Sequence, residues 1–414
     1  MTMNAPALVN APAIDAARLL GDLACLRGFG THQTGVHRPT YSATDMESRQ
    51  WIAERMRQAG LVPEIDGIGN IIGRAPREAG DDRPRLLIGS HSETQNHAGW
   101  LDGALGVMYG LEVARVLPGH VDIASWADEE GHYGVFLGSR SFVGEVAEQE
   151  IDDARNLHDG TPLREALRAA GLADLPRAQV EPGRYRGYLE AHIEQGDELE
   201  ATGLRLGIVT SIVGIWTFSI VFNGVQNHAG TTRMAIRKDA GAALVKLAGD
   251  VQRRFPDVAG PRSVWTIGRI TLTPGAQSII PGRAEMLLQM RDADPAILGH
   301  MEAVARELVA EANAGGPCPA RIENIFRSTP KLMEPAFQAA LEHAAERHAP
   351  GMHQQMPSGA GHDAQILAQV MPAAMLFVPS IGGISHHVAE DTSPEDIVLG
   401  CQVLATAAAE ILGG

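Results

Sequence analysis

Imidazole and carboxylate side chains follow short apolar stretches at several points along the chain. His91 comes soon after RLLIG, and Asp102 begins an apolar, Gly-containing helical pattern. In open α/β sheets the active site lies beyond the carboxyl ends of the strands, where His91 would emerge. Taken alone, a histidine after a strand is usually structural, and Asp102 is equally suited to cap a helix. These two residues are therefore candidates only together with others.

Two adjacent carboxylates, Glu129 and Glu130, follow the apolar stretch VDIASWA. Neighbouring residues that leave a strand point in different directions, so one carboxylate can bind a metal ion while the other faces an attacking water. That division suits metal-assisted hydrolysis, in which a cation lowers the pKa of water and a free carboxylate accepts its proton. A solvated acidic loop is the alternative, and for this motif alone it is the better interpretation.

Two further segments add histidines. His192 lies in a strand-like run between Glu190 and Glu194, and a Gly-rich turn delivers His386 and His387. A two-metal site uses imidazole and carboxylate ligands, with one carboxylate able to bridge the ions. That mixture is supplied by His91, Asp102, Glu130, His192 and His386. The nitrogen and oxygen ligands favour two divalent ions, zinc or manganese, and also accept cobalt or nickel.

The elements that must position these side chains alternate between strand and helix at both ends of the chain. The expected helices cover 16–26, 45–59, 102–117, 335–348, 363–369 and 394–412, and the expected strands 61–65, 69–73, 85–89, 121–127 and 374–378. This alternation predicts an α/β catalytic domain, formed by residues 1–212 and 330–414, with a mostly parallel mixed sheet and helices on both faces. Residues 213–329 read as strand, helix, two strands and helix, which predicts an inserted α+β domain.

Length and charge limit the class of protein. A chain of 414 residues is long enough for two or three domains, and its net charge of −16 argues against nucleic acid as a partner. Its three cysteines are far apart, which favours a reducing compartment. We see no signal peptide at the N-terminus and no apolar run near the roughly 20 residues of a spanning helix. We therefore expect a cytoplasmic protein without membrane contact.

Several motifs, taken together and in order, resemble the hydantoinase/carbamoylase amidases, which include N-carbamoyl-L-amino acid hydrolases and allantoate amidohydrolases. This family lies within the clan of zinc aminoacylases and carboxypeptidases. The resemblance extends from about Gly35 to the final helix. The motifs are GSHSET…LDGALGV, ADEEGHYG…GSR, EAHIEQG, NHAGTTRM…RKDA, IIPG, SGAGHDA and FVPSIGGISHHVAED.

The resemblance implies a role for each matching residue. The five candidate ligands would bind the ions, with Asp102 bridging them and Glu129 as general base. The inserted domain would serve for dimerisation and as a lid, so that His228 reaches the neighbouring subunit's site in a homodimer and stabilises the oxyanion. Arg291 would clamp a substrate carboxylate. The implied substrate contacts are Gln195, His228, Ser278, Arg291, Gly359 and His362.

The sequence departs from the family pattern at a few positions near the implied pocket. Glu93 and Gln289 replace acidic residues that are usually Asp, Ser278 replaces Asn, and Arg233 replaces Pro. His97 and Trp100 fill a stretch that is normally small and Gly-rich. The set of metal ligands and the base are intact, so these departures bear on substrate choice.

The leading hypothesis is hydrolysis of an N-carbamoyl amino acid or ureido acid to ammonia, carbon dioxide and the amino acid. The runner-up is an amidase for acyl amino acids or dipeptides, or for allantoate or ureidoglycolate. A metal-binding or ligand-binding protein that has lost catalysis is a third hypothesis. Glu129 argues against the third, because a purely binding protein has no need of a free carboxylate beside the metals.

Overall fold

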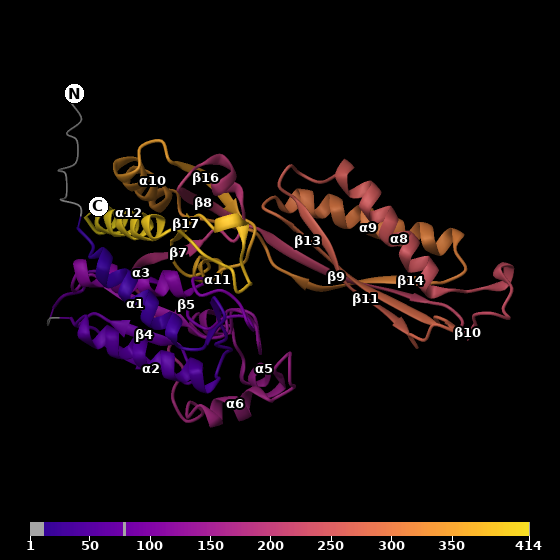
Figure 1. The fold of residues 1–414 in the computed structure, drawn as a ribbon, viewed down its shortest axis with the longest axis horizontal. Coiled ribbons are helices and arrows are strands. Elements are labelled where there is room, and N and C mark those ends of the chain that lie inside the picture. Colours follow the sequence, from indigo (N-terminus) through magenta and orange to yellow (C-terminus); the bar gives the residue numbers. More distant parts are fainter. Residues whose placement is uncertain (1–11, 78–79, 414) are drawn as a thin grey trace. The chain divides into compact units, whose positions relative to one another are not determined.

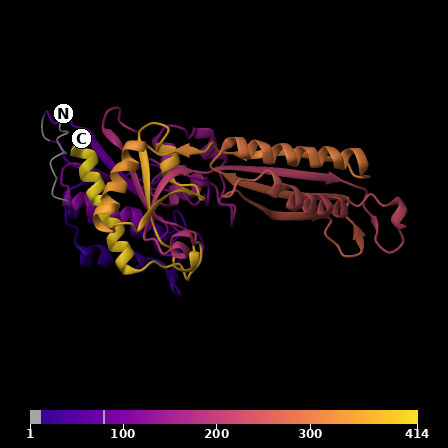
Figure 2. The ribbon, with the colours of Figure 1, turned by 90° about the horizontal axis from the view of Figure 1, so that it is seen from above.

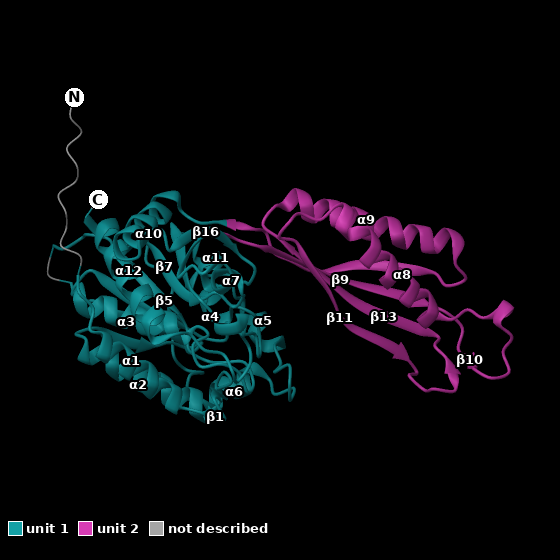
Figure 3. Cartoon of the chain, turned by 45° about the horizontal axis from the view of Figure 1, so that its top comes forward, with its two compact units in different colours: residues 1–210, 332–414 teal, residues 211–331 magenta. Residues whose placement is uncertain are grey.

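The computed structural model describes residues 12–77 and 80–413, and its chain divides into two compact units. The first unit comprises Met1–Thr210 and Leu332–Gly414, and the second comprises Ser211–Lys331 (Figure 3). The prediction that the N-terminus carries no signal peptide concerns a stretch that lies mostly outside the described residues, because residues 1–11 are not among them.

The first unit is built on a mixed sheet with the strand order β15-β8-β17-β7-β5-β6-β4-β3, and β16 pairs with β8. The four central strands, β17, β7, β5 and β6, run parallel, whereas β8, β4 and β3 are antiparallel to their neighbours. The predicted mixed α/β fold is therefore confirmed, with its parallel part limited to these four strands. The strands are β3 (Val62–Ile65), β4 (Ile71–Arg74), β5 (Arg85–His91), β6 (Val121–Trp126), β7 (Tyr185–Ile193), β8 (Leu206–Ile212), β15 (Lys331–Leu332), β16 (His353–Ser358) and β17 (Ala373–Val378), besides the hairpin β1 (Thr31–His32) and β2 (Gly35–Val36).

Helices pack on both faces of this sheet. Successive residues of a strand point to opposite faces. In β17, Val378 lies beside Gly400 of α12, whereas the ring of Phe377 lies against His362, which directly precedes α11. Segments from the start and the end of the chain meet here, because α1 contacts α12 (Figure 1). The helices are α1 (Ala16–Gly28), α2 (Ala43–Gln58), α3 (Ala104–Val116), α4 (Leu137–Phe142), α5 (Glu148–Asp153), α6 (Leu163–Ala169), α7 (Glu198–Thr202), α10 (Pro335–His348), α11 (Asp363–Leu367) and α12 (Pro394–Gly413), with a 3-10 turn η3 (Ile381–Gly383).

Local sequence signals explain where α2 begins and ends. The Ser42 side chain accepts a hydrogen bond from the backbone N–H of Asp45 at 3.2 Å, so Ser42 is the N-cap of this helix. Gly60 follows the helix with a φ of 82°, a left-handed conformation that glycine adopts without steric cost.

The second unit is a four-stranded antiparallel sheet, ordered β11-β13-β9-β14, covered by two helices. Alternate residues of β13 are buried against α8 and α9, and α9 lies along the strands (Figure 2). Strand β14 was not expected, because its sequence ARIENIFR lacks a regular apolar alternation. In the structure most of its residues are exposed. The elements are β9 (Gly214–Asn223), β10 (Asn227–His228), η1 (Met234–Ile236), α8 (Ala240–Arg254), η2 (Phe255–Asp257), β11 (Val264–Thr273), β12 (Ile279–Ile280), β13 (Arg283–Asp292), α9 (Pro295–Gly315) and β14 (Ala320–Arg327).

Helix α12 differs from the expectation that no segment is long and apolar enough to cross a membrane. By length and composition alone Pro394–Gly413 passes that test, although 61% of its apolar window is buried within the structure. It packs against α3, α10 and strand β17. Its apolar character is thereby accounted for as that of a core helix.

Candidate metal centre and active site

The candidate residues of the first unit gather at one edge of its sheet. His91 is the last residue of β5, His192 lies at the end of β7, and Glu129 and Glu130 follow β6. His386 follows β17 after the turn η3. Because these four strands are parallel and adjacent, their carboxyl ends meet at the same edge.

Asp102 lies at the centre of this group, in the segment between β5 and α3. Its Oδ1 is 3.4 Å from His91 Nε2 and 3.0 Å from His192 Nε2. The three side chains are buried, and their ligand atoms lie within 4.8 Å of one another. The N-cap of α3 is Gly103, so the alternative interpretation of Asp102 as a helix cap is wrong.

A second group of possible ligands shares the other oxygen of Asp102. His386 Nε2 lies 3.2 Å from Asp102 Oδ2 and 3.6 Å from Glu130 Oε2. These three side chains also offer ligand atoms within 4.8 Å of one another. One carboxylate thus stands between two sets of nitrogen and oxygen donors, as a bridging ligand of a two-metal site would.

The hydrogen bonds of the imidazoles fit this use. His91 Nδ1 lies 3.1 Å from the carbonyl oxygen of Glu93, and His192 Nδ1 lies 2.9 Å from that of Ile193. A carbonyl can only accept, so Nδ1 of each ring carries a proton, and Nε2 is the ring nitrogen that lies toward Asp102. Once Nε2 has lost its own proton, each ring is the tautomer that a metal ligand requires.

Charges within the group are strongly coupled. Burial alone would raise the pKa of Asp102, but hydrogen bonds with His192, His386 and His91 outweigh it and hold that pKa well below its usual range. The same contact with Asp102 raises the pKa of His386 to about 9. The centre therefore holds protons that a cation would have to displace.

Glu129 stands beside the two groups without belonging to either. Its Oε2 lies 3.6 Å from His91 Nε2. Burial raises the pKa of its carboxyl well above the usual value, and the nearby Glu130, Asp363 and Asp102 carboxylates add to this effect. A carboxyl group with a raised pKa is a better proton acceptor once ionised, which suits a general base.

Gln195 has an unusual geometry for a candidate substrate contact. Its φ is 60°, and its Nε2 donates to Asp102 Oδ2 at 2.9 Å and to Ser385 Oγ at 3.2 Å. Its Oε1 is buried and has no hydrogen-bond partner among the residues that the structure describes. The amide is thus fixed by the central carboxylate and presents one unused acceptor.

The loop 358–362 supplies two more of the predicted contacts. His362 is buried, its ring packs edge-on against His192 at 4.7 Å, and its Nε2 lies 2.9 Å from Ser358 Oγ. Burial lowers the pKa of His362 well below its usual value, so the ring is neutral. Gly359 is exposed with open space around it, whereas a side chain at Gly361 would meet the ring of Phe136.

The remaining predicted contacts belong to the second unit. His228 is exposed in β10, where its Nδ1 accepts the backbone N–H groups of Gly230 and Thr231 at 3.0 and 3.2 Å. Its Nε2 therefore carries the proton and points away as a donor. Ser278 lies next to it, because its carbonyl accepts the N–H of Ala229 at 2.9 Å and β10 pairs with β12.

Arg291 and Gln289 lie on the same face of β13. Arg291 Nε donates to Gln289 Oε1 at 3.0 Å, so the glutamine takes part in orienting the guanidinium. Burial lowers the pKa of Arg291. Arg233, another departure from the family pattern, is exposed in the turn before η1.

His97 lies on an exposed part of the first unit, between two other histidines. Its ring is 4.4 Å from that of His32 and 4.2 Å from that of His37. Trp100 lies under the guanidinium of Arg27 at 4.6 Å. Both departures are therefore packed against other side chains of the first unit. His97 packs against the two histidines that follow α1, and Trp100 packs against Arg27 of α1 itself.

Sequence reasoning missed Glu390 and Ser385. Glu390 is buried, and its Oε1 accepts the backbone N–H groups of Leu101 and Asp102, both at 3.0 Å. Its Oε2 accepts the hydroxyl of Ser385 at 3.2 Å. Glu390 thereby fixes the backbone that carries Asp102. The available signal was its place at the end of the SHHVAED segment, a few residues after a candidate ligand.

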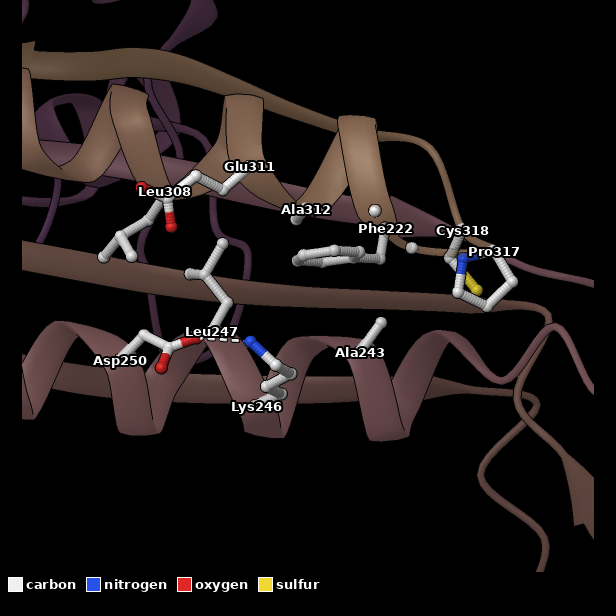
Figure 4. Close-up of a pocket in the computed structure, with 12 residues that line it drawn as sticks. Phe222, Ala243, Lys246, Leu247, Asp250, Leu308, Glu311, Ala312, Pro317 and Cys318 are labelled. Atoms are coloured by element: carbon white, nitrogen blue, oxygen red, sulfur yellow. Dashed lines mark hydrogen bonds and ion pairs between the residues drawn. The ribbon is translucent and has the colours of Figure 1, made fainter.

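A separate cavity of about 370 Å³ lies in the second unit between α8 and α9. Figure 4 shows apolar side chains such as Phe222 and Leu247 along it, with the ion pair Lys246–Asp250 on α8. It contains none of the candidate catalytic residues. Its lining offers no cluster of imidazoles and carboxylates comparable to that around Asp102.

Comparisons with known proteins agree with the fold and the site. The model of the peptidase family M20/M25/M40 matches residues 91–410. An N-carbamoyl-L-amino acid amidohydrolase of Geobacillus stearothermophilus is 34% identical over 89% of this chain and 92% of its own length. An allantoate amidohydrolase of Escherichia coli K12 is 32% identical over 92% of this chain and 94% of its own. The crystal structure of a hydantoinase/carbamoylase family amidase from Burkholderia phymatum superposes with a TM-score of 0.87, at 49% identity over 98% of this chain and 99% of that one.

Fold, side chains and relatives together define an amidohydrolase, an enzyme that hydrolyses carbon–nitrogen bonds in linear amides. The chain belongs to the peptidase family M20/M25/M40 and, within it, to the hydantoinase/carbamoylase amidases.

Proposed function

We propose that this enzyme hydrolyses the carbamoyl carbon–nitrogen bond of an N-carbamoyl amino acid or a related ureido acid. One water and one substrate molecule would give the amino acid, ammonia and carbon dioxide. The observation that carries the proposal is the pair of donor groups that share Asp102, with Glu129 free beside them. The names of the relatives support a ureido substrate.

Five side chains would hold two divalent ions. His91 and His192 would bind one, Glu130 and His386 the other, and Asp102 both, because its two oxygens face the two sets of donors. Zinc or manganese suits these ligands, and cobalt and nickel are also compatible. When bound, such ions polarise a carbonyl and lower the pKa of water.

Glu129 would act as the general base. Its carboxylate would take a proton from the attacking water and pass it to the leaving nitrogen. The raised pKa of Glu129 suits both halves of this transfer, because the group must accept a proton and then give it up. Its position next to His91, outside both donor groups, leaves it available for this role.

The residues that would hold the substrate are those that the family resemblance implies. Gln195 Oε1, an acceptor without a partner, suits an N–H group of a ureido substrate. Arg291 would bind the substrate carboxylate in a bidentate manner. In a homodimer, His228 would donate from Nε2 to the oxyanion that develops in the partner subunit's site. The second unit would serve as dimerisation domain and lid. Ser278, Gly359 and His362 would complete the pocket.

An amidase for N-acyl amino acids, allantoate or ureidoglycolate is the second candidate. Ser278 and Gln289 favour it, because both differ from the family pattern, and Gln289 bonds directly to Arg291, the proposed carboxylate clamp. A cytoplasmic location, with neither nucleic acid nor membrane as partner, accords with the net charge of −16.

The test is a panel of amides offered to the metal-reconstituted enzyme, with ammonia and free amino acid both measured. N-carbamoyl amino acids should release the two products in equal amounts. Release of amino acid without ammonia from N-acyl amino acids alone would establish the second candidate instead. No turnover of any amide with both ions bound would refute both.

A further inference from the structure

Glu93 connects a buried arginine to the backbone of the proposed base. The residue is fully buried in the loop after β5. Its Oε1 accepts the backbone N–H of Glu129 at 2.7 Å, and its Oε2 accepts Arg49 Nη2 at 2.8 Å. Arg49 is itself buried on α2, where its Nε donates to Asp45 and its Nη1 to the carbonyl of Gly69. The carboxylate is therefore anchored to a helix and a loop that lie outside the site.

The neighbouring ligand His91 does not use this carboxylate. His91 Nδ1 lies 3.1 Å from the backbone oxygen of Glu93 but 3.9 Å from its Oε1. A glutamate stands here where the family usually has an aspartate. In the structure a backbone carbonyl holds the imidazole, and the longer side chain reaches past it to Glu129.

The turn that carries Glu129 needs such an anchor. Asp128 has a φ of 57°, which is unfavourable for a residue with a side chain. Its carboxylate accepts the N–H groups of His132, Tyr133 and Gly134 on the far side of Glu129. Glu93 fixes the near side through a charge-assisted hydrogen bond. The carboxylate of Glu129 itself makes one looser contact, with His91 Nε2 at 3.6 Å, so its direction depends on this backbone.

We propose that Glu93 is a positioning residue that orients Glu129 through its backbone N–H, with Arg49 as the fixed cation that holds Glu93. The inference rests on the proposed role of Glu129 as base. It assigns to Glu93 an effect on turnover rather than on metal or substrate binding.

Asp122 offers a matched control. It is a buried carboxylate that likewise joins an arginine to a backbone N–H, accepting Arg184 Nε at 2.7 Å and the N–H of Ala75 at 2.8 Å. It lies at the beginning of β6, whereas Glu129 follows the end of that strand. Loss of its charge should lower the stability of the fold in the same way, without changing the turn that carries Glu129.

The experiment compares Glu93→Gln, Glu93→Asp and Asp122→Asn with the wild type in metal-reconstituted form. Amide hydrogen exchange is followed in the peptides that cover residues 127–134 and 73–77, together with metal content, kcat, KM and Tm. In Glu93→Gln the side-chain NH2 group must face either the N–H of Glu129 or the guanidinium of Arg49, and both are donors. Exchange in 127–134 should therefore accelerate about tenfold or more, and kcat should fall about tenfold or more. KM and metal content should stay unchanged. Asp122→Asn should accelerate exchange only in 73–77. Both should lower Tm by about 5–15 °C.

Glu93→Asp separates the two functions of the residue. The shorter side chain keeps the charge beside Arg49 but cannot also reach the N–H of Glu129, so Tm should recover more than kcat does. Unchanged exchange in 127–134 of Glu93→Gln, or an equal loss of kcat in Asp122→Asn, would overturn the inference. Loss of metal from Glu93→Gln would overturn it too, because Glu93 would then act through His91. If the wild type hydrolyses no amide, the proposed function fails, whereas the exchange data still decide the role of Glu93.

Discussion

Gln195 donates a hydrogen bond from Nε2 to Asp102 Oδ2 at 2.9 Å, and its own Oε1 has no partner within the described part of the chain. The carboxylate at the centre of the proposed metal site therefore also sets the orientation of a proposed substrate contact. A buried acceptor that lacks a donor is costly, which makes it a suitable place for a substrate N–H group.

Replacing Gln195 by leucine should raise KM about 5- to 100-fold and leave two ions bound, because the variant loses one hydrogen bond to the substrate but no metal ligand. Steady-state kinetics and metal analysis measure both quantities. Gln33→Leu is a matched control, since Gln33 also has a positive φ, 53°, and is exposed. An unchanged KM in Gln195→Leu would exclude the contact.

Glu129→Gln should bind both ions and lower kcat about 100- to 10,000-fold, because the amide cannot accept a proton from water. Turnover and metal content are measured on the same preparation. The neighbouring change Glu130→Gln should behave differently and weaken binding of an ion. Near-normal turnover in Glu129→Gln would remove the general-base assignment.

Metal affinity should depend on pH through His386. Its hydrogen bond with Asp102 raises the pKa to about 9, above the usual 6.5, so the imidazole of the metal-free protein is charged below about pH 9. The folded state binds this proton more tightly than the unfolded state. Its stabilising effect is therefore fully present below about pH 6.5 and is lost as the pH rises through about 9.

An imidazole ligand must be neutral, so protons compete with the ion at pH values below about 9. The apparent affinity of the metal-free protein for Mn²⁺ should rise about tenfold per pH unit between about pH 6.5 and 9. Calorimetric titrations in buffers that differ in ionisation enthalpy would detect the released proton. Affinity that does not change with pH, without proton release, would contradict this coupling.

His228→Ala should be nearly inactive alone but should regain part of the activity when mixed with Glu129→Gln under conditions that exchange subunits. In a mixed dimer, one site would combine an intact Glu129 with an intact His228 from the partner. Activity of the mixture, compared with each variant alone, measures the effect. If mixed dimers form and remain inactive, His228 does not serve the neighbouring site.

The sequence predicted the residues that cluster better than the contacts that hold them. Strand ends are recognisable from short apolar runs, and parallel strands bring their ends together, so His91, Glu130 and His192 could be foreseen at one edge. The role of Glu390 could not, because it depends on a loop 288 residues away in sequence that returns to the backbone of Asp102. Strand β14 was missed for a similar reason, since its place in the sheet comes from pairing with β9 rather than from its own pattern.

Glu93 shows the limit of analogy. Its difference from the usual residue was visible in the sequence, but side-chain length alone did not indicate that its carboxylate would contact the N–H of Glu129 instead of His91. That outcome depends on Arg49, which lies 44 residues earlier in the chain.

The most direct test of the account is ammonia release from an N-carbamoyl amino acid while metal-free enzyme is titrated with Mn²⁺. We predict that turnover rises with added ion and reaches its plateau at two ions per chain, as the two donor groups that share Asp102 imply. Full turnover by the metal-free enzyme, or a plateau at one ion per chain, would contradict a shared two-metal site.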